Sequence, residues 1–158
     1  MRIISGELKG KKLSDRLDKS TRPLKDMVRE SIFNILDHSN KVITKIHNAK
    51  VLDLFSGTGS FGIECLSRGA SEVFFFENYH NSLKILKQNI LTLKLENKSK
   101  VYNYSAYNLE GSNFEHRIFD IIFLDPPFKD RKIKSLIDQI KKLKIVDVIS
   151  ISRNVLFG

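Results

Sequence analysis

The stretch Val51-Leu52-Asp53-Leu54-Phe55-Ser56-Gly57-Thr58-Gly59-Ser60-Phe61-Gly62 decides the fold. An apolar run comes first, a glycine-rich turn follows, and the segment after the turn has helical spacing of apolar residues. This order predicts a buried strand that leads through a tight loop into a helix, a place where α/β folds bind nucleotide-like ligands. The glycine spacing alone is a weak signal, so the surrounding residues must identify the ligand.

Alternating strands and helices are predicted for the rest of the chain. Strands are expected at residues 50–55, 72–76, 99–104, 119–124 and 146–151, and helices at 61–68, 81–93 and 133–143. Such alternation predicts an α/β fold with a doubly wound, mostly parallel sheet. We expect a single domain over residues 1–158, in which a basic N-terminal extension, 1–48, precedes the core of the sheet, 49–158.

The N-terminal extension is predicted to contain a hairpin and a helix. Residues 1–13 suggest a small hairpin whose basic tip holds Lys9, Lys11 and Lys12. A helix should begin near Thr21-Arg22-Pro23, because threonine caps helices and proline suits the first turn. The apolar face of this helix is expected to comprise Leu24, Met27, Val28, Ile32, Ile35 and Leu36, whereas Arg22, Lys25 and Arg29 leave that face.

The charge of the chain is unevenly distributed. Its 27 Lys and Arg exceed its 18 Asp and Glu, for a net charge of +9. Both flanks are basic, whereas residues 51–128 are slightly acidic. Acidic groups in the middle suit a ligand with a positive centre, and basic flanks suit a polyanion such as nucleic acid. A generally basic surface without a nucleic-acid partner is the alternative that charge alone leaves open.

Several other classes of protein are not expected. There is no run of about 18 apolar residues that would span a membrane, and the first residues do not resemble a signal peptide. Cys65 is the one cysteine, so we expect a buried thiol, no disulfide and a reducing, cytoplasmic setting. The histidines are scattered without the spacing of ligands, and no metal site is expected.

Two acidic residues argue against a dinucleotide-binding fold, which the glycines with Glu77 would otherwise fit. Asp53 stands at the end of the first strand, where a carboxylate would repel a pyrophosphate but suits the ammonium group of a ligand that carries an amino acid. Asp125 begins the motif Asp125-Pro126-Pro127-Phe128 after the fourth strand, and this motif has no role in hydride transfer.

The glycine-rich stretch together with Asp-Pro-Pro-Phe resembles class I S-adenosylmethionine-dependent methyltransferases that act on exocyclic base amines. Further stretches that sharpen the resemblance are Met1–Gly6, Thr21-Arg22-Pro23, Val28–Asn34 and Gly62–Ala70. In this order they are similar to the RsmD family, which methylates a guanine N2 in 16S ribosomal RNA. The resemblance covers roughly residues 1–130, and its specificity comes from the co-occurrence of the motifs.

The resemblance implies a role for each matching residue. Asp53 would hold the methionine ammonium group, the glycines would let the backbone approach the cofactor, and Glu77 would accept the ribose hydroxyls. Asp125 and the Pro126 carbonyl would hold the target amine, with Phe128 stacking on the base. The implied cofactor site comprises Asp53, Phe55, Gly57, Gly59, Glu77, Asn78, Ser105 and Ala106, and the implied RNA contacts are Lys9, Lys11, Lys12, Arg22, Lys25 and Arg29. The implied partner is 16S rRNA or an assembly intermediate of the small subunit.

The sequence departs from the family pattern at two places. Ser105-Ala106 stands where the family usually has an acid that holds adenine, and a serine hydroxyl accepts hydrogen bonds less strongly than a carboxylate. The family's sheet also continues into an antiparallel hairpin, whereas this sequence reaches Gly158 soon after the fifth predicted strand. We therefore expect a sheet truncated after that strand. A DNA adenine-N6 or cytosine-N4 methyltransferase and a catalytically weak RNA- or cofactor-binding remnant stay open as alternatives.

Overall fold

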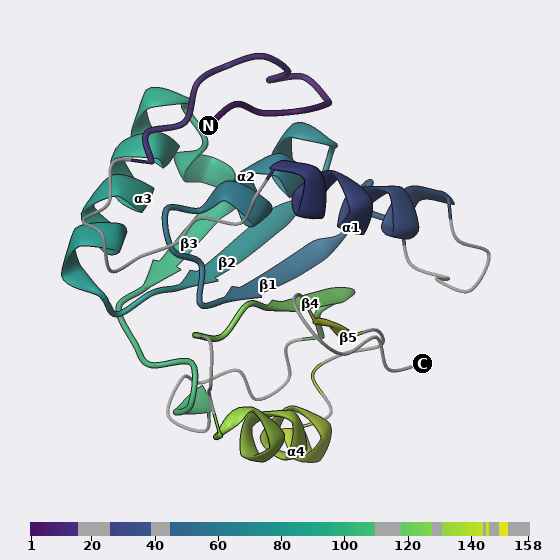
Figure 1. Cartoon of the computed structure of the whole chain (residues 1–158), viewed down its shortest axis with the longest axis vertical. Helices are drawn as coiled ribbons and strands as arrows, with labels where there is room; N and C mark the ends of the chain where they lie inside the picture. The colour runs from purple at the N-terminus through teal and green to yellow at the C-terminus, as the bar shows by residue number, and fades with distance from the viewer. Residues whose placement is uncertain are drawn as a thin grey trace.

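A parallel sheet of five strands forms the centre of the computed structural model, which describes residues 1–15, 26–38, 45–109, 118–127, 131–143, 145 and 149–151. The strand order is β3-β2-β1-β4-β5, so the chain turns back across the sheet between β3 and β4 (Figure 1). The strands are β1 Lys50–Leu54, β2 Glu72–Phe76, β3 Ser99–Tyr102, β4 Ile121–Leu124 and β5 Ile149–Ile151. This order confirms the predicted doubly wound sheet.

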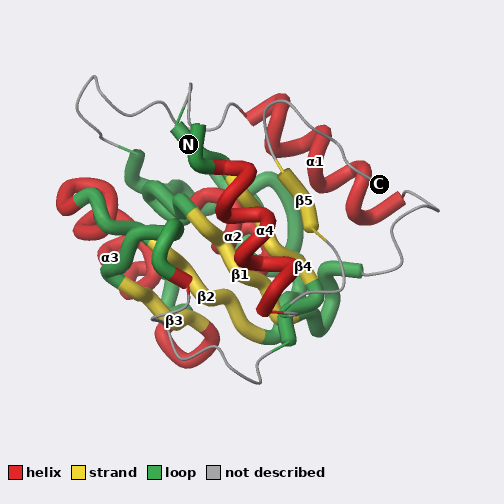
Figure 2. The backbone as a smooth tube through the Cα atoms, turned by 90° about the horizontal axis from the view of Figure 1, so that it is seen from below, coloured by secondary structure: helices red, strands yellow, loops and turns green. Residues whose placement is uncertain are grey.

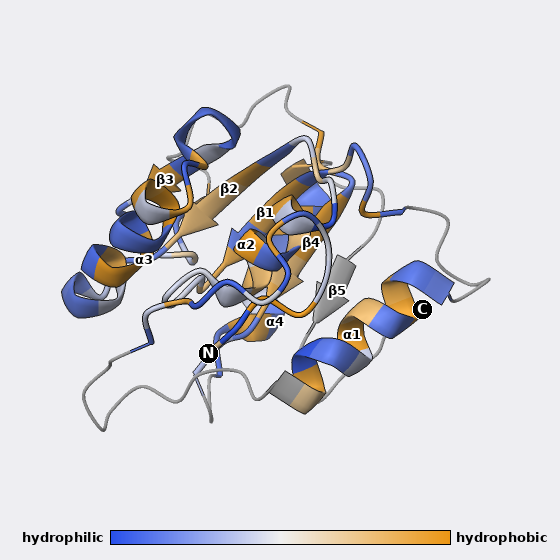
Figure 3. Ribbon diagram, turned by 90° about the horizontal axis from the view of Figure 1, so that it is seen from above, coloured by the Kyte–Doolittle hydropathy of each residue, from blue (hydrophilic) through white to orange (hydrophobic). Residues whose placement is uncertain are grey.

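Helices cover both faces of the sheet, as Figures 1 and 2 show from two directions. Their bounds are α1 Asp26–His38, α2 Ser60–Ser67, α3 His80–Thr92 and α4 Ile133–Leu143, with a short 3-10 helix, η1, at Glu96–Lys98. Helices α1, α2 and α3 pack on one face in a first core, and α4 packs on the other face in a second core. Alternate residues of β1, β2 and β4 enter alternate cores, and these three strands are mainly orange in Figure 3.

The predicted element boundaries agree closely with the structure. Helices α2 and α3 each begin and end one residue earlier than predicted, and the bounds of α4 and β2 are as predicted. Strand β3 ends at Tyr102, its last residue paired with β2, and β4 begins at Ile121, its first residue paired with β1. The predicted helix start near residues 21–23 lies outside the described residues.

The predicted apolar face of α1 is wrong in part. Leu36 is buried and Ile32 packs against the core, as predicted. Met27, Val28 and Ile35, however, are 80%, 38% and 40% exposed, whereas Arg29 and Phe33 are fully buried. The ring of Phe33 stacks on Phe61 of α2, with centroids 5.0 Å apart. Since an aromatic ring buries more area than the exposed aliphatic side chains, this stacking favours the observed orientation of the helix.

The first fifteen residues form the predicted hairpin and pack on α2 and α3. An antiparallel bridge pairs Arg2 with Lys12, and the amide of Ile3 donates to the carbonyl of Lys11 at 3.0 Å. Ile3 and Leu13 are buried in the core shared by α1, α2 and α3. The hairpin is therefore part of the folded core and not an appendage.

Replacing Gly6 by alanine is expected to destabilise the protein by about 2–4 kcal/mol. Gly6 has a φ of +82°, and a Cβ there would collide with the carbonyl oxygen of Ser67. Gly10 is a matched control, because its φ is +81° but a Cβ would meet nothing within 4 Å. Gly10→Ala should cost only about 1 kcal/mol, the cost of the left-handed backbone. Urea unfolding of both variants measures the difference, and equal losses would contradict the predicted collision.

Candidate cofactor and active site

The carboxyl ends of β1, β2, β3 and β4 meet in register at one edge of the sheet. Leu54 of β1 lies opposite Phe76 of β2 and Leu124 of β4, and Phe76 lies opposite Tyr102 of β3. The residues that follow these strand ends therefore come together at this edge. The direction in which successive strands are added to the sheet also reverses there, between β1 and β4. In open α/β sheets this is the position where ligands bind.

The loop after β1 is held in an unusual backbone conformation. Phe55, Gly57 and Gly59 have φ angles of 65°, 56° and 87°. The amide of Ser56 donates to the carbonyl of Phe76 at 2.9 Å, and its hydroxyl donates to the carbonyl of Asp53 at 2.6 Å. A left-handed backbone is strained at a phenylalanine, and such strain concentrates at functional sites.

The three glycines of the loop and the following first turn of α2 have different surroundings. A Cβ at Gly57 would meet no atom within 4 Å, whereas one at Gly59 would collide with Leu86 of α3 and one at Gly62 with Phe75 of β2. Gly59 and Gly62 are thus required for packing of the helices on the loop and the sheet. Gly57 instead leaves open space beside its backbone, which a ligand could fill.

Asp53 is a buried carboxylate with one oxygen available. It is 1% exposed, and its Oδ2 accepts a hydrogen bond of 3.1 Å from the amide of Gly62 in the first turn of α2. Its Oδ1 has no hydrogen-bond partner among the residues that the structure describes. Burial raises the pKa of Asp53 well above its usual value, although the Gly62 amide lowers it, and the nearby charges of Asp125 and Glu77 raise the pKa further. A cationic group would therefore stabilise this site.

Glu77 connects the end of β2 to the glycine loop. Its Oε2 accepts a hydrogen bond of 2.8 Å from the amide of Gly57, and its Oε1 accepts one of 2.7 Å from the amide of Tyr79. Burial raises the pKa of Glu77, and its backbone hydrogen bonds oppose that shift. A carboxylate has about four acceptor positions, so each oxygen can still accept a ligand hydroxyl.

The remaining residues of the predicted cofactor site border this edge. Asn78, next to Glu77, is exposed and Ser105 is half-buried, whereas Ala106 is buried among the side chains of the second core. The hydroxyl of Ser105 accepts a long hydrogen bond of 3.4 Å from the amide of Tyr107. The ring of Phe55 lies against that of Tyr107, with centroids 5.3 Å apart, and forms an aromatic wall.

The Asp-Pro-Pro motif begins directly at the end of β4. Asp125 and Pro126 are half-buried and Pro127 is exposed. Asp125 is close enough to Asp53 to raise the pKa of that carboxyl by charge repulsion. The structure thus brings Asp53, Glu77 and Asp125 to one edge, while Phe128 lies outside the described residues.

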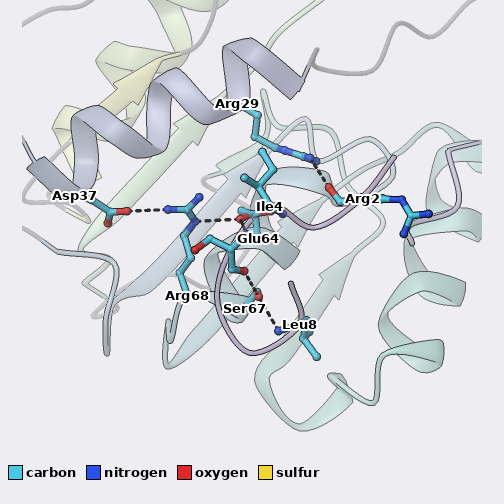
Figure 4. Close-up of polar contacts among 9 residues, drawn as sticks. Arg2, Ile4, Leu8, Arg29, Asp37, Glu64, Ser67 and Arg68 are labelled. Carbon is cyan, nitrogen blue, oxygen red and sulfur yellow. Dashed lines mark hydrogen bonds and ion pairs between the residues drawn. The ribbon is translucent and has the colours of Figure 1, made fainter. Parts of the chain in front are cut away.

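The basic residues predicted to contact RNA differ in their exposure to solvent. Lys9, Lys11 and Lys12 are exposed on the hairpin, and Arg22 and Lys25 lie outside the described residues. The prediction that Arg29 is an exposed RNA contact is wrong. Its guanidinium is buried, donating to the carbonyl of Arg2 at 2.6 Å through Nη2 and to the sulfur of Met1 at 2.8 Å through Nη1. Arg29 holds the hairpin against α1 (Figure 4).

Glu64 and Ser67 of α2 also hold the hairpin, and sequence reasoning missed both. The buried carboxylate of Glu64 accepts hydrogen bonds from the amides of Ile4 and Ser5, at 2.8 and 2.9 Å, and pairs with Arg68 at 3.0 Å. Ser67 accepts a hydrogen bond of 3.0 Å from the amide of Leu8 (Figure 4). The available signal for Glu64 was a single acid among the apolar residues of a short helix.

No helix in the described part of the chain is long and apolar enough to cross a membrane. Cys65 is buried in the core, and burial raises its pKa well above the usual value, as expected for an unreactive thiol.

Comparisons with known proteins agree on one family. A family model described as "Conserved hypothetical protein 95" matches residues 1–151. The chain is 38% identical over 129 residues to the Ribosomal RNA small subunit methyltransferase D of Haemophilus influenzae, covering 81% of this chain and 64% of that protein. It is 36% identical over 148 residues to YlbH of Bacillus subtilis, covering 93% of this chain and 77% of that protein.

A solved structure of the Escherichia coli protein yhhF has the same fold. Its TM-score is 0.80 at 29% identity, and the match covers 100% of this chain and 84% of that chain. With the family model and the relatives, this likeness establishes the family and its enzyme class. The chain belongs to the RsmD family of rRNA methyltransferases.

Proposed function

We propose that this protein transfers a methyl group from S-adenosylmethionine to the exocyclic N2 amine of a guanine in 16S rRNA. The observation that carries the proposal is the meeting of Asp53, Glu77 and Asp125 at the carboxyl edge of the sheet, beside an open glycine loop. Its substrate would be the rRNA or an assembly intermediate of the small ribosomal subunit, and the protein would act in the cytoplasm.

The residues at this edge fit S-adenosylmethionine. The Oδ1 of Asp53 lacks a partner among the described residues and is the natural acceptor for the methionine ammonium group, directly or through water. The open space beside Gly57 admits the methionine portion, and Glu77 can accept the ribose hydroxyls. Asn78, Ser105 and the backbone of Ala106 would border the adenine, with Phe55 in the aromatic wall.

Asp125 and the Pro126 carbonyl would hold the target amine. Each can accept one of the two amine hydrogens, which fixes the nitrogen and directs its lone pair at the reacting carbon. The target base must leave any helical stack to reach this edge, and Phe128 follows the motif as a stacking surface. Lys9, Lys11 and Lys12, with Arg22 and Lys25, would contact RNA phosphates.

The chemistry requires positioning more than proton removal. When bound, S-adenosylmethionine would supply a methyl group on a positively charged sulfur, with a neutral thioether as the leaving group. Asp125 and the Pro126 carbonyl would hold the amine nitrogen toward that methyl carbon. The amine becomes acidic only after it is methylated, so Asp125 can receive the proton at that stage or pass it to water.

A side-by-side transfer assay tests this function. Purified protein is given methyl-labelled S-adenosylmethionine with unmodified 16S rRNA transcript, partly assembled small subunits or double-stranded DNA. We expect label in the RNA samples, at guanine N2 after nuclease digestion and chromatography. Label in DNA adenine or cytosine would show that the protein is a DNA methyltransferase and would contradict the proposal. If calorimetry detects no cofactor binding, the protein is better described as a catalytically weak RNA-binding remnant.

Replacing Asp53 by asparagine is expected to stabilise the protein without ligand and to weaken cofactor binding. Ionised Asp53 opposes folding, because its pKa is raised in the folded state. The folded protein therefore binds the proton more tightly than the unfolded chain does, and stability falls as pH rises through that pKa. Asparagine does not ionise, so the stability gain, about 1–3 kcal/mol, should be larger at pH 8 than at pH 5.

Urea unfolding at both pH values and calorimetry with S-adenosylhomocysteine measure these two effects. The Kd should rise by more than about tenfold, because the ammonium group loses its charged partner. Asp120→Asn is the control. Asp120 is half-buried at the other end of β4 and accepts a hydrogen bond from the amide of Lys50. Its replacement should leave the Kd for S-adenosylhomocysteine unchanged. An Asp53→Asn variant that is less stable at pH 8 than the parent would contradict the assignment.

A further inference from the structure

Asn89 of α3 forms hydrogen bonds to two segments that are far apart in the sequence. Its side chain is 4% exposed. Its Oδ1 accepts from the amide of Ser14 at 2.9 Å, and its Nδ2 donates to the carbonyls of Ser14 and Thr58, both at 3.0 Å. The amide orientation is unambiguous, because a backbone amide can only donate and the two carbonyls can only accept.

Thr58 lies in the glycine loop, between Gly57 and Gly59. On the sheet side of this loop, the amide of Gly57 donates to Glu77 at 2.8 Å. On the α3 side, Asn89 holds the carbonyl of Thr58. The loop backbone is therefore fixed from two directions, and Asn89 is the support on the side of α3.

Ser14 lies near the end of the N-terminal segment described here, residues 1–15. Glu64 and Ser67 hold the earlier part of this segment on α2, and Asn89 holds Ser14 beside the glycine loop. The sequence that follows carries Arg22 and Lys25. Both backbone groups of Ser14 pair with the amide that also holds Thr58, so the two segments share one side chain.

We propose that Asn89 is a positioning residue that couples RNA binding by the N-terminal segment to cofactor binding by the glycine loop. The proposal rests on the proposed function. RNA that binds the N-terminal segment would fix the backbone at Ser14, and Ser14 would in turn fix the orientation of the Asn89 amide. The Asn89 amide then holds the Thr58 carbonyl, and with it the neighbouring Gly57, in the conformation that admits the cofactor. Such coupling is reciprocal by thermodynamic necessity, so the cofactor also strengthens RNA binding.

Equilibrium dialysis with radiolabelled S-adenosylhomocysteine tests the coupling. The Kd is measured with and without saturating unmodified 16S rRNA transcript. For the parent protein we expect RNA to lower the Kd by about fivefold or more. Asn89→Asp keeps the acceptor for Ser14 but loses both donors, so RNA should lower its Kd by less than about twofold. Gln88→Glu is the matched control, since it makes the same change of amide to carboxylate at an exposed neighbour and should keep the coupling.

Hydrogen exchange of the Gly57 and Gly59 amides gives a second readout that needs no variant. Their exchange should slow when RNA is added to the parent protein. A purely structural role for Asn89 predicts no such slowing, and a parent protein that binds both ligands with an RNA-independent Kd overturns the inference while leaving the proposed function intact. A parent protein that binds no S-adenosylhomocysteine overturns both.

Ser67→Ala separates coupling from loss of stability. It loosens the hairpin at the end remote from the glycine loop, where Ser67 accepts the amide of Leu8. This variant should lower the urea midpoint and keep the effect of RNA on the Kd. Loss of that effect in Ser67→Ala, or its retention in Asn89→Asp, would overturn the assignment of Asn89.

Discussion

Asp125→Ala is expected to lower methyl transfer to 16S rRNA by at least about a hundredfold while the Kd for S-adenosylhomocysteine changes little. Asp125 lies at the end of β4, at the edge where Asp53 and Glu77 also lie. Its proposed contact is with the target amine, so its loss leaves that nitrogen free to rotate away from the reacting carbon. Because the contact is to the RNA base, the cofactor retains its own partners.

The measurement is a single-turnover transfer rate with enzyme in excess, together with calorimetry on the same preparation. Asp120→Ala is the matched control, since Asp120 is also half-buried but precedes β4, at the opposite end of that strand. The control should transfer at close to the parent rate. A normal rate in Asp125→Ala would show that the wrong residue has been assigned to the amine. Loss of cofactor binding in the same variant would show that Asp125 acts on the cofactor instead.

The sheet and the edge that carries the acids were predictable because their signals are local. Continuous apolar runs mark the buried strands. Asp53 lies one residue before the end of β1, and Glu77 and Asp125 directly follow β2 and β4. In a parallel sheet all these ends lie at one edge, so the strand boundaries alone bring the acids together. The family resemblance names the same three acids, and the structure places them at this edge.

The orientation of α1 was not predictable from periodicity, because two faces of that helix are apolar. Met27, Val28 and Ile35 form one apolar face and Phe33 lies on another. Leu36, predicted to belong with the first set, is buried with Phe33. The choice depends on tertiary contacts: Phe33 stacks on Phe61, and the guanidinium of Arg68 lies over the Phe33 ring at 4.3 Å. Burial of Arg29 follows from the same orientation.

Two of the side chains that hold the N-terminal segment, Glu64 and Asn89, could not be recognised from the sequence for a related reason. Glu64 and Asn89 are polar residues in the buried parts of α2 and α3. A polar residue in such a place indicates a hydrogen-bonding partner, but the sequence does not show that backbone groups near the N-terminus are those partners. The contacts span 60 and 75 residues along the chain, so they emerge only from the folded structure.

Glu64→Ala is expected to destabilise the protein by about 3–5 kcal/mol, which would be the largest loss of stability among the substitutions considered. The carboxylate is fully buried and accepts from the amides of Ile4 and Ser5 as well as from Arg68. Its removal leaves these amides without their acceptor and leaves Arg68, 13% exposed, with Asp37 as its remaining carboxylate at 2.7 Å. Glu64→Gln retains one acceptor oxygen and should lose less.

Urea unfolding gives the total loss, and hydrogen exchange shows where it arises. If Glu64 acts by holding the hairpin, the amides of Ile4 and Ser5 should lose protection in Glu64→Ala more than the amides of β1 and β2 do. A uniform loss across the sheet would instead mean that Glu64 stabilises α2 itself. Local release of the hairpin would also displace Lys9, Lys11 and Lys12, the proposed RNA contacts that the hairpin carries. The variant should then bind RNA with lower affinity even at temperatures where the sheet is fully folded.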